Sequence, residues 1–134
     1  MLNRITDTLN FQAEALTLRS ERQRLIASNI ANAETPGYVA RDLDFSSALR
    51  QAVGEQSAGG TLATTHARHL AIPGGATAER NLLYATSSQA NLDNNTVDMD
   101  RERASFADNA IKYESTLRFI NGQVSTLMSA IKGQ

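Results

Sequence analysis

The sequence predicts a mainly α-helical protein in which two long terminal helices pack as a coiled-coil-like pair, joined by an irregular, glycine-rich and partly extended middle region. Two observations lead to this prediction. Apolar residues recur at helical spacing near both ends of the chain, and five of the eight glycines lie between residues 54 and 75. With 134 residues the chain has the length of one domain.

The N-terminal segment, residues 1–32, contains neither Gly nor Pro and is expected to form one helix. At about 100° per residue its apolar side chains fall on two stripes on nearly opposite sides of that helix. One stripe has Leu2, Ile5, Leu9, Leu16, Ile26 and Ile30, and the other has Phe11, Leu18 and Leu25. Two stripes indicate a helix packed between two partners, in an assembly or as the central helix of a small bundle.

The C-terminal segment, residues 96–134, has a more regular pattern. Its apolar residues alternate steps of four and three, which is typical of a coiled-coil seam. The seam consists of Phe106, Ala110, Tyr113, Leu117, Ile120, Val124, Leu127 and Ile131. Thr96 or Asp98 can cap the start of this helix, and Asp98, Asp100 and Glu102 place negative charge where the helix dipole favours it. The helix is expected to continue through Gly122, because the seam keeps its register there.

Residues 33–95 separate the two helices. A turn, an extended segment and a short helix at 45–53 are expected within residues 33–53. Residues 54–95 are rich in Gly, Ser, Thr and Asn, and are expected to form an irregular loop region that need not be ordered in an isolated monomer. Within it, residues 62–65, 70–72 and 82–86 resemble short strands.

The composition argues against several classes of function. The 13 basic and 14 acidic residues give a net charge of −1, which does not attract nucleic acid. With no Cys, disulfides and thiolate chemistry are excluded. His66 and His69 have no neighbouring acidic residue to complete a metal shell, and no glycine cluster has nucleotide-binding spacing. We therefore expect no enzyme activity, no cofactor or metal, and neither a nucleic-acid partner nor a small-molecule substrate.

The most specific segment lies at the end of the first helix. Pro36 fixes its own φ and keeps Thr35 extended, and Gly37 allows the positive φ of a type II turn. The amides of Asn29 and Asn32 can bind carbonyls of the last helical turn or a neighbouring subunit. An ordinary helix end followed by a Pro-Gly turn would have these features too. The segment reads Ser28-Asn29-Ile30-Ala31-Asn32, and then Thr35-Pro36-Gly37-Tyr38.

This segment resembles the N-terminal signature of flagellar rod and hook proteins. Residues 40–45, which include Arg41 and Phe45, and residues 95–102, which include Asp98 and Asp100, are similar to the FlgB family of proximal rod proteins in particular. The resemblance spans the whole chain. Distal rod and hook relatives carry a large domain inserted between the same helices. Asn94 departs from the pattern, because the family more often has Gly there.

The resemblance implies a structural subunit of the bacterial flagellar basal body. Such subunits leave the cell unfolded through the flagellar type III export channel, without a cleaved signal peptide. The sequence agrees in having no apolar run long enough for such a signal or for a membrane span. In the periplasm they form the rod, a tubular helical array that transmits motor torque. The implied partners are other copies of the chain, other rod subunits, and the inner-membrane ring and export gate.

We therefore expect helix packing within or between subunits to drive assembly, together with the motif described above. Two alternatives stay open: a soluble helical adaptor or export chaperone, and the other short proximal rod subunit, against which the Asp-Leu-Asp-Phe stretch at 42–45 argues. The expected interface residues are Ile5, Leu9, Leu16, Leu18, Leu25, Ile26, Ile30, Phe106, Tyr113, Leu117, Ile120, Val124, Leu127 and Ile131.

Overall fold

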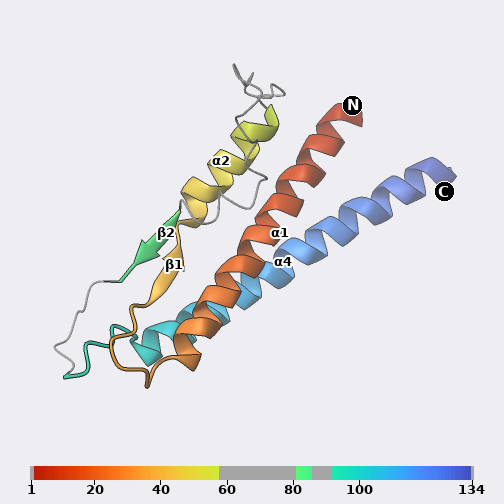
Figure 1. Ribbon diagram of the computed structural model, residues 1–134. Coiled ribbons are helices and arrows are strands. Elements are labelled where there is room, and N and C mark those ends of the chain that lie inside the picture. Colours follow the sequence, from red (N-terminus) through yellow and green to blue (C-terminus); the bar gives the residue numbers. More distant parts are fainter. Residues whose placement is uncertain (1, 58–80, 86–91, 134) are drawn as a thin grey trace, which may run out of the picture.

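The computed structural model describes residues 2–57, 81–85 and 92–133 (Figure 1). Its elements are α1 (Leu2–Ala31), β1 (Arg41–Leu43), α2 (Phe45–Ser57), β2 (Leu82–Tyr84) and α4 (Met99–Lys132). The long helices α1 and α4 lie side by side and run in opposite directions. The expected helical architecture, with two packed terminal helices, is confirmed. The strand-like segments at 62–65 and 70–72 lie outside the described residues.

Helix α1 is the central element of the structure. It contacts α4 on one side, and α2 and β1 on another (Figure 1). Leu18 and Leu25 form a buried cluster with Leu43 of β1 and Ala48 of α2. Phe45, Leu49 and Leu82 pack against this cluster. The two apolar stripes of α1 therefore pack against two partners, α4 on one side and α2 with β1 on the other. Both partners belong to the same chain.

The middle segment adds a small layer to α1. Strands β1 and β2 pair antiparallel, with Arg41 opposite Tyr84 and Leu43 opposite Leu82. Asp44 then caps α2: its Oδ1 accepts from the backbone N–H of Ser47 at 3.1 Å and its Oδ2 from the Ser47 hydroxyl at 2.8 Å. These hydrogen bonds lower the pKa of Asp44, because they favour the ionised form. Helix α2 extends to Ser57, four residues beyond the expected end.

Local signals set both ends of α4. Of the two expected caps, Asp98 is the one used, and its Oδ1 accepts from the backbone N–H groups of Asp100 and Arg101 at 3.1 and 3.2 Å. Gly133 ends the helix with φ +71° and donates its N–H to Ser129 O. Gly122 lies inside the helix, as expected. None of the helices in the described ranges is long and apolar enough to cross a membrane.

Helix α4 turns only part of its apolar seam toward α1. Its two buried residues, Asn109 and Thr116, are polar and spaced by seven, and Glu102 and Gln123 extend this polar line in both directions. The seam residues Tyr113, Ile120 and Leu127 are half-buried beside it. Asn109 is 0% exposed and Thr116 8%, whereas Leu117 and Val124 of the seam are 38% and 40% exposed. At 100° per residue the polar line and the seam differ by about 60° around the helix. The apolar period therefore predicts the helix α4, but it does not predict which of its residues are most deeply buried against α1.

Candidate functional site

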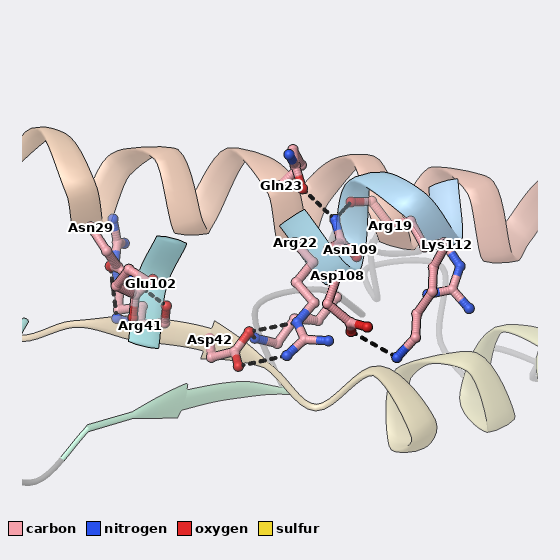
Figure 2. Close-up of polar contacts among 11 residues, drawn as sticks. Arg19, Arg22, Gln23, Asn29, Arg41, Asp42, Glu102, Asp108, Asn109 and Lys112 are labelled. Carbon is pink, nitrogen blue, oxygen red and sulfur yellow. Dashed lines mark hydrogen bonds and ion pairs between the residues drawn. The ribbon is translucent and has the colours of Figure 1, made fainter. Parts of the chain in front are cut away.

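The end of α1, the turn after it and the start of α4 meet in a polar cluster, which we call the joint (residues 28–41 and 93–102). Asn29, only 1% exposed, lies at its centre (Figure 2). Its Nδ2 donates to Arg41 O at 2.7 Å and to Glu102 Oε2 at 3.1 Å. Its Oδ1 accepts from the Arg41 N–H at 3.0 Å and from the Tyr38 hydroxyl at 3.2 Å. One side chain thus connects α1, β1 and α4.

Asn95 binds the turn that follows α1, from a position far along the chain. Its Nδ2 lies within hydrogen-bonding distance of three carbonyl oxygens, those of Asn32, Ala33 and Thr35, at 3.0, 2.9 and 2.7 Å. These carbonyls belong to the turn that follows α1, in which Asn32 O and Thr35 O also accept from the backbone N–H groups of Thr35 and Tyr38. Asn95 is 2% exposed and therefore binds this turn to the segment before α4 from inside the joint. The sequence analysis did not assign it this role.

The turn at residues 35–38 is bound to the rest of its own chain. The N–H of Gly37 donates to Asp93 O at 2.7 Å, and the N–H of Thr96 donates to Tyr38 O at 3.0 Å. Gly37 has φ +71°, as expected. Asn94, where the resembled family more often has Gly, also has a positive φ, of 57°. Asn tolerates this left-handed conformation better than most residues, so the position keeps the geometry that a glycine would have.

The remaining motif residues have smaller roles. The Ser28 hydroxyl lies 3.2 Å from the Tyr38 hydroxyl, and Asn32 Nδ2 donates to Ser28 O at 2.8 Å, which is the last-turn contact expected for Asn32. The Thr35 hydroxyl donates to Asn32 Oδ1 at 3.2 Å. Ala31 and Pro36 are exposed. The Asn29 amide contacts its own chain, so in this conformation it is not available to a neighbouring subunit.

Replacing Gly37 by Ala is expected to lower the free energy of unfolding by about 1 kcal/mol, because an L-residue at φ +71° is strained. A Cβ at this position would meet nothing within 4 Å, so the cost is backbone strain alone. Gly122→Ala is the matched control, since its Cβ also meets nothing within 4 Å but its backbone is helical. That control should stabilise the chain by up to about 1 kcal/mol. If Gly37→Ala and Gly122→Ala shifted the midpoint of urea denaturation by the same amount in the same direction, this account of Gly37 would be contradicted.

Glu102 is the titratable group at the centre of the joint. Burial raises its pKa, and the Asp42 carboxylate acts in the same direction, whereas the Asn29 hydrogen bond and the charges of Arg101 and Arg22 oppose the shift. The folded chain therefore holds this proton more tightly than the unfolded chain. Its contribution to stability is fully present below the unfolded pKa and is lost as the pH rises through the folded pKa.

Glu102→Gln should remove this pH dependence and keep an acceptor for Asn29. The difference in melting temperature between Glu102→Gln and the unaltered chain is then expected to grow in favour of the variant from about pH 4 to about pH 7. Thermal unfolding followed by circular dichroism at several pH values measures it. A difference that stays constant with pH would show that Glu102 titrates alike in the folded and unfolded chains.

Two arginines of α1 attach the strand layer. Arg22 donates to Asp42 of β1 through Nε at 3.0 Å and Nη2 at 3.1 Å, a bidentate pair that Figure 2 shows beside Asp108 and Lys112. The guanidinium carbon of Arg19 lies 4.3 Å from the centre of the Phe45 ring. Desolvation by burial lowers the pKa of Arg19, and the neighbouring Arg22 charge adds to the effect. These contacts fix α2 and β1 relative to the joint.

The expected interface residues separate into three groups in the structure. Leu18, Leu25 and Ile26 are buried inside the chain, at 6%, 4% and 1% exposure, so they form its own core and cannot reach a neighbour in this conformation. Half-buried are Leu9, Leu16, Ile30, Tyr113, Ile120 and Leu127. Exposed are Ile5, Phe106, Leu117, Val124 and Ile131.

Most of the exposed group lies on one side of α4. We call this side the apolar strip: Phe106, Leu117, Val124, Met128 and Ile131. Met128 was missed by the sequence analysis because it does not fit the alternation of four and three. It lies four residues after Val124, however, and therefore on the same helix face. It is 50% exposed.

A groove of about 780 Å³ opens between the N-terminal turns of α1 and the C-terminal half of α4. Ile5 and Leu127, both expected at an interface, line this groove together with Phe119. In Figure 1 the two helices diverge toward these ends. The remaining lining residues are Arg4, Thr8, Ser115, Arg118, Gly122, Gln123 and Thr126. Phe119 lies about 140° from Val124 around α4, so this groove is a surface separate from the apolar strip.

The chain is similar to known proteins over nearly its whole length. Residues 9–38 match the family model described as "Flagella basal body rod protein". A "Flagellar basal body rod protein FlgB" of Salmonella typhimurium is 45% identical and covers 99% of both chains. The proteins of the same name from Proteus mirabilis and Cereibacter sphaeroides are 44% and 47% identical, with 98% and 96% of both chains covered.

Proposed function

This chain belongs to the FlgB family of flagellar basal body rod proteins, and from that premise we propose that it is a structural subunit of the proximal rod that assembles through the apolar strip of α4. The observation that carries the proposal is the contrast between two surfaces. The polar groups of Asn29 and Asn95 are bonded within the chain, whereas large apolar side chains remain exposed along α4. Exposed apolar patches of this kind mark interaction sites.

The proposed mechanism is helix packing between copies in a tubular array. Two copies that met through the same strip around a two-fold axis would form a closed dimer. A head-to-tail contact with a different patch of the next copy instead generates an open helical assembly. The joint fixes the position of α4 within each subunit, so every copy would present the strip at the same angle. Such an array is the shaft through which motor torque would pass.

The remaining features of the proposal follow from the resemblance. The chain would leave the cell unfolded through the flagellar export channel without a cleaved signal. It would contact other rod subunits, the inner-membrane ring and the export gate at the base of the rod. The relatives named above are called rod proteins, which supports this assignment over a soluble adaptor or export chaperone. Their shared name also supports it over the other short proximal rod subunit.

Deletion and complementation test this proposal. Cells that lack the gene should be non-motile, and a tagged copy that restores swimming should be found in purified basal bodies after the hook and filament are removed. A chain that restores swimming but remains in the cytoplasm, absent from basal bodies, would instead support the adaptor or chaperone alternative.

A further inference from the structure

Asn109 is the only buried side chain of α4 in the described ranges that donates a hydrogen bond to the backbone of α1. It is 0% exposed, and its Nδ2 donates to Arg19 O at 2.9 Å and to Gln23 Oε1 at 2.6 Å (Figure 2). A backbone carbonyl can only accept, so the amide nitrogen must face Arg19. The Asn109 Oδ1 atom is then left buried with no hydrogen-bond partner.

This packing buries polar atoms of α4 while large apolar residues of the same helix stay exposed. In the described part of the chain, three buried side-chain polar atoms lack a partner, and all belong to α1 or α4: Arg19 Nε, Asn109 Oδ1 and Gln123 Oε1. Meanwhile Leu117 and Val124, on the adjacent side of α4, are 38% and 40% exposed. Val124 and Leu117 lie about 60° and about 80° around the helix from Asn109, so a roll of about that size would turn them toward α1.

We propose that Asn109 is a positioning residue that prevents this roll and so keeps the apolar strip outside. A single buried amide can select one helix arrangement over others that are at least as stable, because the competing arrangements leave it unpaired. Rolling α4 would pull the Asn109 amide away from Arg19 O and Gln23 Oε1. The hydrogen bond between Asn29 and Glu102 opposes the roll at the start of α4, and Asn109 opposes it seven residues farther along the helix.

The consequence for assembly rests on the proposed function. If α4 rotated about its axis so that the apolar strip faced α1, each monomer would cover its own strip. Less apolar surface would then remain exposed for a neighbour. Asn109 would then lower the stability of the single subunit and, in return, keep the apolar strip available for contacts with a neighbour. The inference about α4 itself concerns only the isolated chain, and it can be tested without any rod.

The absence of native cysteines makes a labelling test direct. Single cysteines replace Gln123, on the side toward α1, and Val124, on the strip. In the otherwise unaltered chain, the cysteine at 124 should react with a thiol reagent at least tenfold faster than the one at 123. Asn109→Leu should reverse or abolish this ratio while its melting temperature stays the same or rises.

Thr116→Val is the matched control. Thr116 is also buried on the side toward α1, but its hydroxyl donates to Lys112 O of its own helix at 2.9 Å. The control should therefore keep the labelling ratio. A ratio that is unchanged in Asn109→Leu would overturn the inference, and so would an equal change in Thr116→Val. Failure of the proposed function is recognised separately, by absence of the unaltered chain from basal bodies.

Discussion

Asn29→Ala is expected to lower the free energy of unfolding by about 3–5 kcal/mol, more than any other substitution of a motif residue. The change removes the partner of the Arg41 N–H, the Arg41 carbonyl and the Glu102 carboxylate at once. A buried polar group left unpaired costs about 1–3 kcal/mol. Because Asn29 connects three elements, α4 should also lose its fixed position. Urea denaturation followed by circular dichroism measures the loss.

Asn32→Ala provides the control for this prediction. The Asn32 amide donates to Ser28 O, one turn back in the same helix, and its side chain is only half-buried. Its removal should cost less than about 1 kcal/mol, because water can replace the lost bond. If Asn29→Ala were no more destabilising than Asn32→Ala, the joint would not be the element that fixes the position of α4.

Leu117→Asp is expected to abolish rod assembly and swimming with little effect on the isolated subunit. Leu117 is 38% exposed, so a carboxylate there can stay hydrated in the monomer. In the proposed array the same carboxylate would be buried against a neighbour, at a cost of several kcal/mol in each contact. Export should continue, since the chain would pass the channel unfolded. Motility assays and immunoblots of isolated basal bodies measure the outcome.

Ala107→Asp is a suitable control, because it adds the same charge to an exposed position of α4 that lies away from the apolar strip. Cells with this variant should swim. Normal swimming of the Leu117→Asp cells would show that the apolar strip is not an assembly surface. A large drop in melting temperature of purified Leu117→Asp would show that the residue serves the fold of the subunit instead.

Features that depend on neighbouring residues along the chain could be predicted from the sequence. The apolar period located α1 and α4, the acidic residues at 98–102 located the start of α4, and Pro36-Gly37 predicted a positive φ. In each case the interaction spans a few residues, so the pattern is visible locally. The two stripes of α1 also predicted correctly that it packs between two partners.

Features that depend on contacts between distant segments could not be predicted in this way. Asn95 binds carbonyls about 60 residues earlier, and no local pattern distinguishes such a donor from an ordinary loop asparagine. The side of α4 that faces α1 was also not predictable. Apolar periodicity favoured the seam, whereas the hydrogen bonds of Asn109 and Glu102 to α1 fix the polar side inward. The apolar pattern of α4 shows which side chains could be buried. Which of them are buried depends on the contacts that the helix makes with α1.

The central claim is that each subunit carries a preformed joint and leaves the apolar strip of α4 for its neighbours. A reconstruction of isolated basal bodies at side-chain resolution tests it most directly. We predict that Asn29 still contacts Arg41 and Glu102 within each copy of the chain. We also predict that Leu117 and Val124 are buried against an adjacent subunit. The account would be contradicted by a rod in which the strip faces solvent or packs against α1 of its own chain.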